Sequence, residues 1–449
     1  MIHKYKFKDK HIVLDVNSGA VHVVEKIIYD ILDVYNGENK EEVFVAIRDK
    51  YDESSVHDAV SDLDYLISHG LLFSDDSHIT DEIIHNKKPV VKALCLHISH
   101  DCNMNCRYCF GDQGAFEGIR ELMSFEVGKK AIDFLVQNSG SRRNLEVDFF
   151  GGEPLMNFDV VKALVHYGKT VEKTYRKNIR FTITTNGLLL DDEKIDYINE
   201  HMDNIILSID GRPEIHDKMR RTWNDKGTYD LIIKNYHHFV QKRKDALYYV
   251  RGTFTKENLD FSEDLIHLIN QGFKNVSIEP VVVNDNISYA LREDDLDSIF
   301  NEYEKLSDYY IQEYKNGKAF EFFHFNLDLD QGPCIIKRIS GCGAGTEYMA
   351  IAPNGDIYPC HQFVGNKDFL LGNINENCFE NRLYDTFNKA HIFNKEKCKS
   401  CWAKFYCSGG CHANAYNING SIYEPYELGC EMEKKRIECA IGIQAALTE

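Results

Sequence analysis

Long apolar stretches are missing from this sequence of 449 residues. No apolar run approaches the roughly 20 residues that a membrane-spanning helix requires. The opening segment, MIHKYKFKDKHIVLD, also lacks the apolar core of a signal peptide. We therefore expect a soluble, cytoplasmic protein that has no membrane partner.

Positive charge is also in short supply. The sequence has 52 Lys and Arg residues against 71 Asp and Glu residues, which gives a formal net charge of −19. An acidic surface lacks the cations that neutralise phosphates, so it argues against nucleic acid and anionic lipid as partners. Internal repeats and low-complexity tracts do not occur. The length exceeds one typical core, so we expect two or three domains.

Cysteine is missing from the middle of the chain. Three cysteines lie at 102–109 and ten lie between Cys334 and Cys439, with none in the interval between the two groups. In a cytoplasmic protein such clusters indicate metal or redox chemistry at two sites rather than a disulfide framework. The one remaining cysteine, Cys95, stands in the apolar run ALCLHIS, and we expect it to be a buried thiol.

Residues 1–85 are predicted to form a small unit. The β-branched runs HIVLDV and AVHVV flank Asn17-Ser18-Gly19, which predicts a hairpin. Three amphipathic helical stretches follow, at 25–36, 40–51 and 54–70. Gly70 ends the last of them before a predicted strand at 71–75, an order typical of a winged-helix-like unit.

Two roles are open for this first unit. The helix at 54–70 has no Lys or Arg, which disfavours DNA recognition. An exposed strand edge beside a helix can instead bind an extended peptide as an added strand. A purely structural cap is the alternative.

Strands and helices alternate from 93 to 282, after a linker at 86–92. The six strand candidates are ALCLHIS, LEVDFF, IRFTITT, NIILSID, LYYVRGTFT and NVSIEPVVV. Their near-continuous apolar character predicts an α/β fold with a parallel sheet, either open or curled into a partial (β/α)6 barrel over 93–310. Active sites in such sheets lie at the C-terminal ends of the strands. Gly and Cys dominate a last unit, 334–449, which the predicted helix ELGCEMEKKRIECAIGIQAAL closes.

Cys102, Cys106 and Cys109 directly follow the first of these strands, so they lie in a loop at its C-terminal end. The spacing Cys-x3-Cys-x2-Cys supplies three of the four corners of a 4Fe–4S cluster. The fourth iron is then open to a substrate or cofactor, as in zinc enzymes that reserve one position. The alternative is a zinc site completed by His97 or His100, although zinc sites mostly use paired spacings.

This spacing, with Tyr108 before the third cysteine, resembles the radical S-adenosylmethionine (SAM) superfamily. The resemblance implies that the methionyl group of SAM chelates the open iron, and that the reduced cluster cleaves SAM to a 5′-deoxyadenosyl radical. It also implies SAM contacts at the ends of the following strands. These are Gly151, Gly152 and Glu153 for the methionyl amine, Thr185 of the TTNG motif, Ser208 for the ribose, and Arg220 or Arg251 for the carboxylate. Two glycines permit a close backbone approach, and a carboxylate accepts hydrogen bonds from an ammonium.

The C-terminal cysteines resemble those of the SPASM domain, an extension of radical SAM enzymes that carries two auxiliary 4Fe–4S clusters. The resemblance implies an outer cluster held by Cys398, Cys401, Cys407 and Cys430. It implies an inner cluster held by Cys342, Cys360 and Cys411, which is closed by Cys334 or left open. An open iron would bind a substrate thiol and lower its pKa. Cys378 and Cys439 are expected to be buried thiols without a metal.

The order of recognition element, radical SAM unit and SPASM unit resembles peptide maturases, which bind the leader of a ribosomally made precursor. The stretch LDVNSGAVHVV and the overall length are similar to those of the SCIFF maturases, whose substrates have six cysteines in about forty-five residues. This similarity implies a thioether between a cysteine sulfur and the α-carbon of another residue, threonine in this subfamily. It also implies an external low-potential electron donor.

Several alternatives stay open for the reaction. His361 stands where sulfatase-maturing enzymes carry an aspartate base, which disfavours formylglycine formation, although a neutral histidine can also accept a proton. Carbon–carbon crosslinking and epimerisation are the other peptide modifications. A redox-sensing binding protein with iron–sulfur clusters is the alternative outside enzymes.

Overall fold

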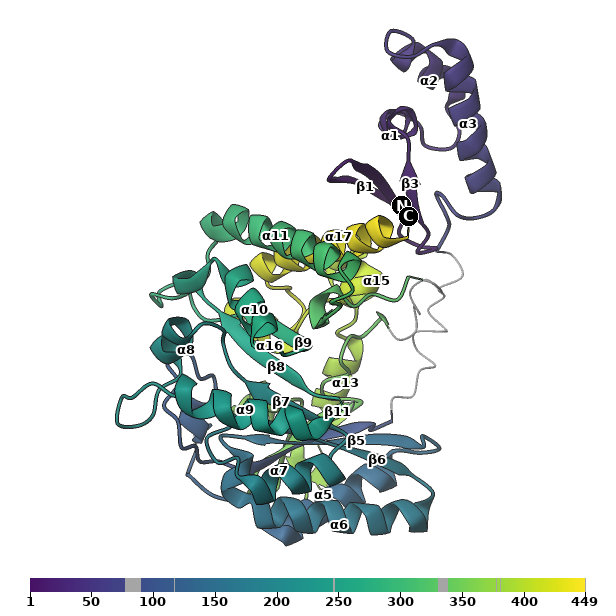
Figure 1. The fold of residues 1–449 in the computed structure, drawn as a ribbon. Helices are drawn as coiled ribbons and strands as arrows, with labels where there is room; N and C mark the ends of the chain where they lie inside the picture. Colours follow the sequence, from purple (N-terminus) through teal and green to yellow (C-terminus); the bar gives the residue numbers. More distant parts are fainter. Residues whose placement is uncertain are drawn as a thin grey trace.

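The strands in the described part of the chain form one large sheet and one small sheet. We describe a computed structural model, in which the described residues are 1–76, 90–116, 118–244, 247–329, 338–376, 378–379 and 381–448. The large sheet has the strand order β10-β9-β8-β7-β6-β5-β4-β11-β12-β13-β14, and the small one the order β1-β2-β3. Figure 1 shows the small sheet above the large one, beside the last helix.

Six parallel strands make up the centre of the large sheet, as predicted. They are β4 (Ala93–Ser99), β5 (Asn144–Gly151), β6 (Asn178–Thr185), β7 (Asn204–Ser208), β8 (Tyr249–Phe254) and β9 (Asn275–Pro280). Each pairs in parallel with its neighbour in chain order. The carboxyl ends of all six strands therefore open at the same edge, where the predicted site residues follow them.

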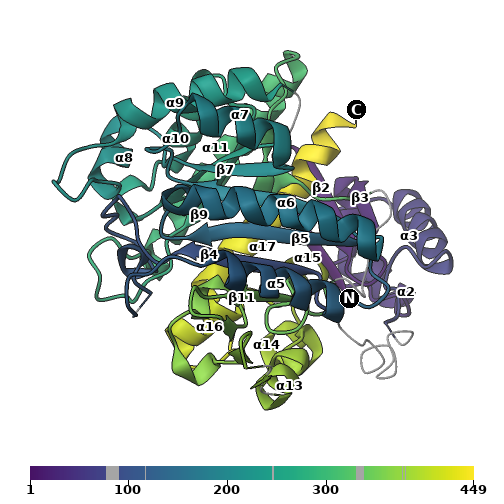
Figure 2. The ribbon, with the colours of Figure 1, turned by 90° about the horizontal axis from the view of Figure 1, so that it is seen from below.

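Helices between the strands cover one face of this sheet. They are α5 (Phe125–Asn138), α6 (Phe158–Tyr175), α7 (Asp192–His201), α8 (Pro213–Met219), α9 (Tyr229–Arg243) and α10 (Phe261–Asn270). Side-chain caps define where two of them begin: Ser124 accepts from the Val127 N–H of α5, and Asp191 accepts from the Lys194 N–H of α7. Figure 2 shows α5 and α6 lying along β4 and β5. The apolar faces of these helices bury the sheet and leave the strand ends free for polar groups.

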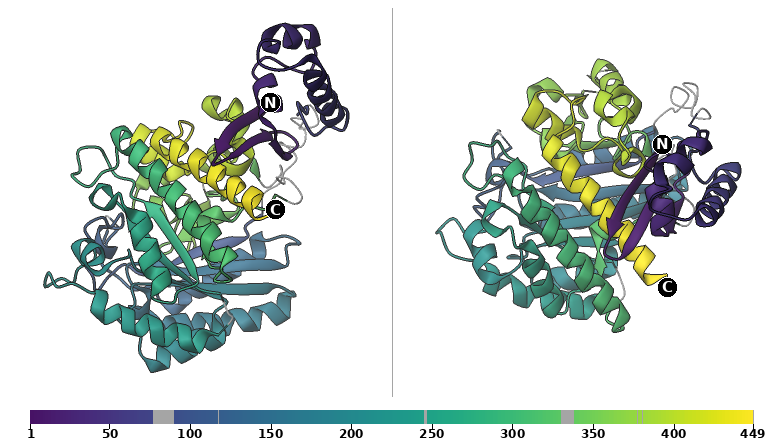
Figure 3. Two further views of the ribbon diagram at one scale, coloured as in Figure 1. Left: turned by 45° about the horizontal axis from the view of Figure 1, so that its top comes forward. Right: turned by 90° about the horizontal axis from the view of Figure 1, so that it is seen from above.

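The C-terminal part continues the same sheet. After α11 (Leu296–Lys315), β10 (Glu321–Phe322) adds in parallel to β9, and β11 (Tyr348–Ile351) pairs in parallel with β4. The sheet ends with β12 (Asp356–Tyr358), β13 (Gly372–Asn373) and β14 (Cys378–Phe379). The remaining helices are α13 (Asn381–Lys389), α14 (Glu396–Lys399), α15 (Lys404–Cys407), α16 (His412–Asn419) and α17 (Glu427–Leu447). The bounds of α17 confirm the predicted last helix, and Figure 3 shows it packed beside α11.

The small sheet contains the predicted hairpin and one strand that was not predicted. Its strands are β1 (Ile2–Phe7), β2 (Lys10–Asp15) and β3 (Val21–Val24), all antiparallel, and α1 (Lys26–Ile31), α2 (Lys40–Ile47) and α3 (Glu53–Ser68) follow. In β1, the alternation of IHKYKF turns Tyr5 and Phe7 toward α17, where the Tyr5 hydroxyl donates to the Glu438 carbonyl at 2.9 Å. The ring of His3 stacks on Trp402 with 3.7 Å between centroids. This strand was not predicted because the segment has no continuous apolar run, although its alternation of lysines with Tyr5 and Phe7 is typical of a half-buried strand.

The predicted strand at 71–75 is wrong. The chain bends there, and Phe73 has a φ of +50°, which an extended strand does not allow. Side chains of the hairpin form hydrogen bonds with the backbone of this segment, in the place of the backbone hydrogen bonds of a strand pair. The Ser74 N–H donates to Asp15 Oδ2 at 3.1 Å, and Asn17 Nδ2 donates to the Ser74 carbonyl at 2.8 Å.

The predicted boundaries of the three units, 1–85, 93–310 and 334–449, stay predictions, because β1 packs on α17 and β11 extends the central sheet. Across the described ranges, no helix combines the length and apolar character of a membrane span.

Candidate functional site

Cys102, Cys106 and Cys109 lie together in the loop that follows β4. The segment 219–223 holds this loop through the backbone, because the Asn105 N–H donates to the Arg221 carbonyl at 2.7 Å and the Arg107 N–H donates to the Met219 carbonyl at 2.9 Å. The Trp223 indole N–H donates to the Cys102 carbonyl at 2.9 Å. Three hydrogen bonds therefore hold this loop against the segment 219–223.

Burial disfavours the thiolate forms of these cysteines. It is the main cause that raises the pKa of Cys102 and of Cys106 to about 12, and the charge of Cys109 contributes to both values. Because a thiol must lose its proton to bind iron, a bound cluster would supply the positive charge that stabilises the thiolates. Within the described ranges, no three His, Cys, Asp or Glu side chains surround one ion-sized point. A four-iron cluster binds each thiolate through a separate iron, so this set of sulfur donors fits it.

The two histidines of the zinc alternative contact other groups. His97 Nδ1 and His100 Nε2 lie 3.1 Å apart in a hydrogen bond. Both rings pack on Phe116, with centroids at 4.6 Å and 4.8 Å. Burial lowers the pKa of both imidazoles, to about 4 for His100, so they are neutral. These contacts place both rings in an aromatic cluster and disfavour the zinc alternative.

Gly151 and Gly152 bind the start of the cysteine loop through the backbone. The Gly152 N–H donates to the Ser99 carbonyl at 2.7 Å, and the Glu153 N–H donates to the Asp101 carbonyl at 2.9 Å. Gly151 has a φ of +122°, and a Cβ on either glycine would overlap the carbonyl oxygen of Ser99 or Asp101. Only glycine permits this close approach.

Glu153 and Thr185, both predicted SAM contacts, bind each other. Glu153 is fully buried, and its Oε1 accepts from the Thr185 hydroxyl at 2.8 Å and from the Leu155 N–H at 3.0 Å. Its Oε2 accepts from the Asn186 N–H at 2.8 Å. Burial raises the pKa of Glu153 to about 7. The carboxyl group therefore connects the ends of β5 and β6, and its contact with a methionyl amine stays a prediction.

Asn186 is a site residue that the sequence reading did not assign. Its Nδ2 donates to Asn103 Oδ1 at 2.7 Å and lies 3.7 Å from Cys102 Sγ, in the geometry of a hydrogen bond to sulfur. It follows Thr185 in the TTNG motif, and its place just after a strand end was the available signal. A hydrogen bond to a ligand sulfur tunes the potential of an iron–sulfur cluster.

Asp210 is a second missed residue, and it organises Tyr108 and Arg220. Its carboxylate, fully buried, accepts from the Tyr108 hydroxyl at 2.6–2.7 Å and from Arg220 Nε at 3.0 Å. The guanidinium of Arg220 lies over the Tyr108 ring, 5.5 Å from its centroid, and its charge partly opposes the rise that burial causes in the pKa of Cys106. Arg220 therefore provides positive charge beside the loop while paired with Asp210.

The other two predicted SAM contacts lie on β7 and β8. Ser208 ends β7, and its carbonyl accepts from the Tyr236 hydroxyl at 2.9 Å. Arg251, more than half exposed, pairs with Glu279 at 3.4 Å. Ser208 and Arg251 are register partners, so these two positions share one rim of the sheet.

Removing the charge of Asp210 is expected to destabilise the fold. The variant Asp210→Asn leaves Arg220 as an uncompensated buried cation, and we expect a loss of about 3–5 kcal/mol in the free energy of unfolding. The matched control is Asp260→Asn, which breaks a half-exposed ion pair with Arg212 (2.9 Å) and should cost about 0.2–1 kcal/mol. Anaerobic denaturant unfolding of both variants checks this, and equal losses would contradict it.

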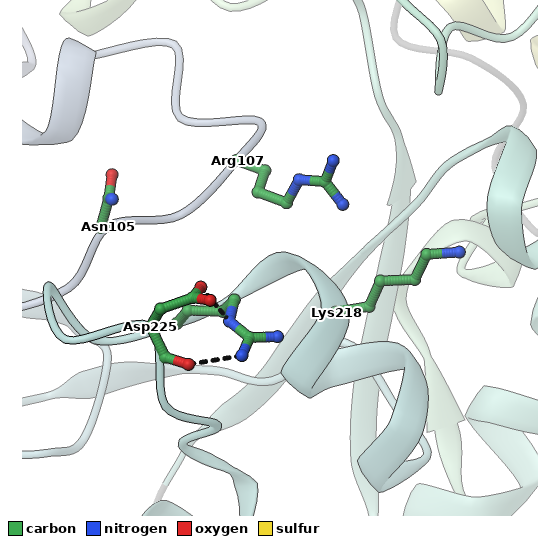
Figure 4. A pocket seen from close by; sticks show the side chains of 5 residues that line it. Asn105, Arg107, Lys218 and Asp225 are labelled. Atoms are coloured by element: carbon green, nitrogen blue, oxygen red, sulfur yellow. Dashed lines mark hydrogen bonds and ion pairs between the residues drawn. The ribbon is translucent and has the colours of Figure 1, made fainter.

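A pocket of about 390 Å³ borders the cysteine loop on its outer side. Its lining residues are Asn105, Arg107, Lys218, Arg221 and Asp225. Arg221 forms an ion pair with Asp225 at 2.5 Å. Figure 4 shows the side chains of Arg107 and Lys218 extending away from Asp225. Positive side chains therefore predominate on this rim of an otherwise acidic protein.

The four predicted outer-cluster cysteines surround one cavity. Cys398, Cys401, Cys407 and Cys430 all line a hollow of about 700 Å³. Their charges act on one another, and burial raises the pKa of Cys407 to about 12 and of Cys430 to about 11. This set of four sulfur donors fits a fully ligated 4Fe–4S cluster.

The three predicted inner-cluster cysteines also lie together. Burial raises the pKa of Cys360, and the charges of Cys411 and Cys342 raise it further. Gln362 Nε2 lies 3.8 Å from Cys411 Sγ. Cys334 and the side chain of Cys378 lie outside the described residues, so the choice between a closed and an open inner cluster stays open. Cys95 and Cys439 are buried, as expected.

His361 connects the inner cysteines with the first site. Its ring packs against Phe150 at 5.1 Å and against Phe110 at 5.7 Å, and Phe110 directly follows Cys109. Its Nδ1 forms a hydrogen bond with the Tyr348 hydroxyl at 3.2 Å. Burial lowers the pKa of His361 to about 4, so the imidazole is neutral. The residue after Cys109 and the residue after Cys360 are therefore in ring contact, which connects the two sets of cysteines.

Two family models match this chain. The model of the radical SAM superfamily matches residues 96–269, and that of the iron–sulfur cluster-binding SPASM domain matches residues 342–402. A cysteine-type anaerobic sulfatase-maturating enzyme of Clostridium novyi is 26% identical over 72% of this chain and 89% of its own. The radical SAM cyclopropyl synthase TigE of Paramaledivibacter caminithermalis is 23% identical over 93% of this chain and 89% of its own. The subtilosin biosynthesis protein AlbA of Bacillus subtilis is 25% identical over 74% and 70%.

Solved structures share the fold. Native anSMEcpe with bound AdoMet and Cp18Cys peptide superposes with a TM-score of 0.65 at 21% identity, covering 80% of this chain and 99% of its own. SuiB of Streptococcus suis bound to its precursor peptide SuiA gives a TM-score of 0.52 at 16% identity over 94% and 97%. The chain therefore carries a radical SAM domain and a SPASM domain, a pair of domains that implies SAM and iron–sulfur clusters as cofactors.

Proposed function

We propose that the protein is a peptide maturase that forms an intramolecular thioether in a ribosomally made, cysteine-rich precursor. The bond joins a cysteine sulfur to the α-carbon of a threonine or similar residue, as in the SCIFF maturases. The observation that carries this proposal is the contact between Phe110 and His361, which brings the loop of Cys109 beside Cys360. One bound peptide could then reach both the site that would cleave SAM and the inner set of cysteines, which would bind a thiolate.

Each site has its own part in the reaction. SAM bound at Cys102, Cys106 and Cys109 would supply a 5′-deoxyadenosyl radical, which removes a hydrogen atom from the peptide. The inner set of cysteines would hold the substrate sulfur as a thiolate. Per thioether, the peptide loses two protons and two electrons: one of each as the hydrogen atom, the other proton from the thiol, and the other electron through the auxiliary clusters. Phe110, Phe150 and His361 form one aromatic cluster, and a peptide bound over it would shield a radical from water and so from quenching.

The small sheet would bind the leader of the precursor. Its strand β3 is an edge strand with Val23 half exposed, whereas β1 packs its side chains on α17. An extended peptide can add to such an edge through backbone hydrogen bonds. SuiB is described in complex with a precursor peptide, and its structure covers 94% of this chain. An external low-potential donor would reduce the first cluster.

The product distinguishes this reaction from others. Anaerobic holoenzyme, SAM and dithionite are incubated with a small cysteine-rich precursor peptide, and the product is alkylated and sequenced by tandem mass spectrometry. We expect a loss of two hydrogens per bond and one thiol per bond that resists alkylation. A product in which every cysteine is still alkylated would contradict thioether formation.

A second candidate is carbon–carbon bond formation. The cyclopropyl synthase TigE aligns with 93% of this chain, including its N-terminal part, and this coverage favours the candidate. The same experiment separates the two reactions, because a carbon–carbon bond also removes two hydrogens but leaves all thiols free for alkylation. Formylglycine formation would exchange sulfur for oxygen, and epimerisation would leave the mass unchanged.

A further inference from the structure

Lys395 is a fully buried cation between the two sets of SPASM cysteines. Its side chain is 0% exposed, and its Nζ donates to the Gly409 carbonyl at 2.7 Å and to His412 Nδ1 at 3.3 Å. Both acceptors are neutral. No carboxylate in the described part of the chain forms an ion pair with this ammonium. Burying a charge without a counter-charge costs several kcal/mol, so the position requires a nearby anion.

The groups around Lys395 belong to both sets of cysteines. His412, which lies 3.3 Å from Nζ, directly follows Cys411 of the inner set. Burial lowers the pKa of Lys395, and Cys398, Cys407, Cys411 and Cys430 would oppose this shift as thiolates. Gly409, which accepts from Nζ, lies in the sequence between Cys407 and Cys411. The backbone of Lys395 is also part of the outer site, because its carbonyl accepts from the Cys398 N–H at 2.9 Å. The ammonium of Lys395 therefore lies beside both the outer and the inner set of cysteines.

We propose that Lys395 is the shared counter-charge of the two auxiliary clusters and that it raises the reduction potentials of both. The inference rests on the proposed assignment of the two cysteine sets to two clusters. Reduction adds a negative charge to each cluster, and a cation held nearby in a medium of low dielectric stabilises the reduced form. Lys395 would thus act on the clusters through its charge alone, since it contacts no reacting atom.

The test replaces Lys395 by methionine, which keeps most of the stem and removes the charge. Potentials of the reconstituted holoenzyme are measured by redox titration with electron paramagnetic resonance. We expect the reduced-to-oxidised ratio of both auxiliary clusters at a fixed potential to fall about tenfold or more, a shift of about 59 mV or more toward negative potentials for one electron. The SAM-binding cluster should keep its potential. The matched control is Lys399→Met, an exposed lysine of the same helix region that pairs with Glu396 at 2.8 Å, and it should shift neither cluster.

Iron content separates the possible failures. Wild-type protein with three four-iron clusters holds about twelve irons per chain, and about four would be missing if one auxiliary assignment were wrong. Full iron in Lys395→Met with the potentials of the control would overturn the role of Lys395 alone. If Lys395→Met loses auxiliary iron, Lys395→Arg decides: recovered iron with wild-type potentials supports the counter-charge, and loss of iron in both variants overturns it in favour of a packing role.

Discussion

Replacement of Cys102, Cys106 and Cys109 by alanine is expected to abolish the formation of 5′-deoxyadenosine from SAM. These three thiols are the cysteines of the loop after β4, and each would bind one iron of the SAM-binding cluster. The iron content should fall by about four per chain, while the eight or so irons of the auxiliary clusters remain. Chromatography of the nucleoside and a colorimetric iron assay measure both effects.

The control for this variant is Cys439→Ala. Cys439 is a buried thiol of α17 that belongs to neither cysteine set. We expect it to keep the iron content and most of the rate, at a modest cost in stability from the small cavity. SAM consumption by the triple variant at the wild-type rate would refute the assignment of the first site.

Gly152→Ala is expected to lower the rate of SAM cleavage by about 100-fold. The new Cβ would overlap the Asp101 carbonyl oxygen, which is backbone and cannot rotate away. Asp101 directly precedes Cys102 at the start of the cysteine loop. The backbone of Asp101 must therefore move away from the new Cβ, and this movement displaces Cys102 and its neighbours. A misplacement of about 1 Å in a catalytic site costs about this factor. The nucleoside assay measures the rate, and the iron content shows whether the cluster is still bound.

Gly118→Ala provides the comparison for this prediction. Gly118 lies in the same stretch of chain after the cysteines, but the nearest atom to an added Cβ, the Ala115 carbonyl oxygen, is 3.4 Å away. We expect a rate within about twofold of wild type, since surface changes of this kind cost little. Equal rates in the two glycine variants would show that the close approach at Gly152 does not position the loop.

The parallel sheet could be predicted because each of its strands is a short apolar run followed by a polar motif. The strands from Ala93 to Pro280 were all identified, as was the last helix. The small strand β1 was missed because its segment has no continuous apolar run, although the alternation of Tyr5 and Phe7 with lysines is the pattern of a half-buried strand. The segment 71–75 is apolar enough to resemble a strand in the sequence. It forms none, and the side chains of Asp15 and Asn17 bind the backbone of Ser74.

The cysteines of the candidate site could be predicted from their spacing, and the side chains around them could not. Asn186 had a sequence signal in the TTNG motif, but the contacts of Asn186 with Cys102 and of Asp210 with Tyr108 depend on how the strand ends are placed in space. The contact between Phe110 and His361 joins residues far apart in the sequence, and no periodic pattern reports such a contact. Lys395 looks like an ordinary charged residue in the sequence, and only packing shows that it is buried.

The parallel pairing of β4 with β11 has a consequence for synthesis of the chain. β4 is the first strand of the central sheet to leave the ribosome, and β11 follows only after every other parallel strand. Translation proceeds at roughly 5–20 residues per second, so for some time one edge of the apolar strand β4 has no partner for its backbone N–H and carbonyl groups. Such an edge templates association with other chains. Truncated products that stop before Tyr348 are expected to aggregate, so heterologous expression should favour slow induction with chaperones and full-length selection by a C-terminal tag.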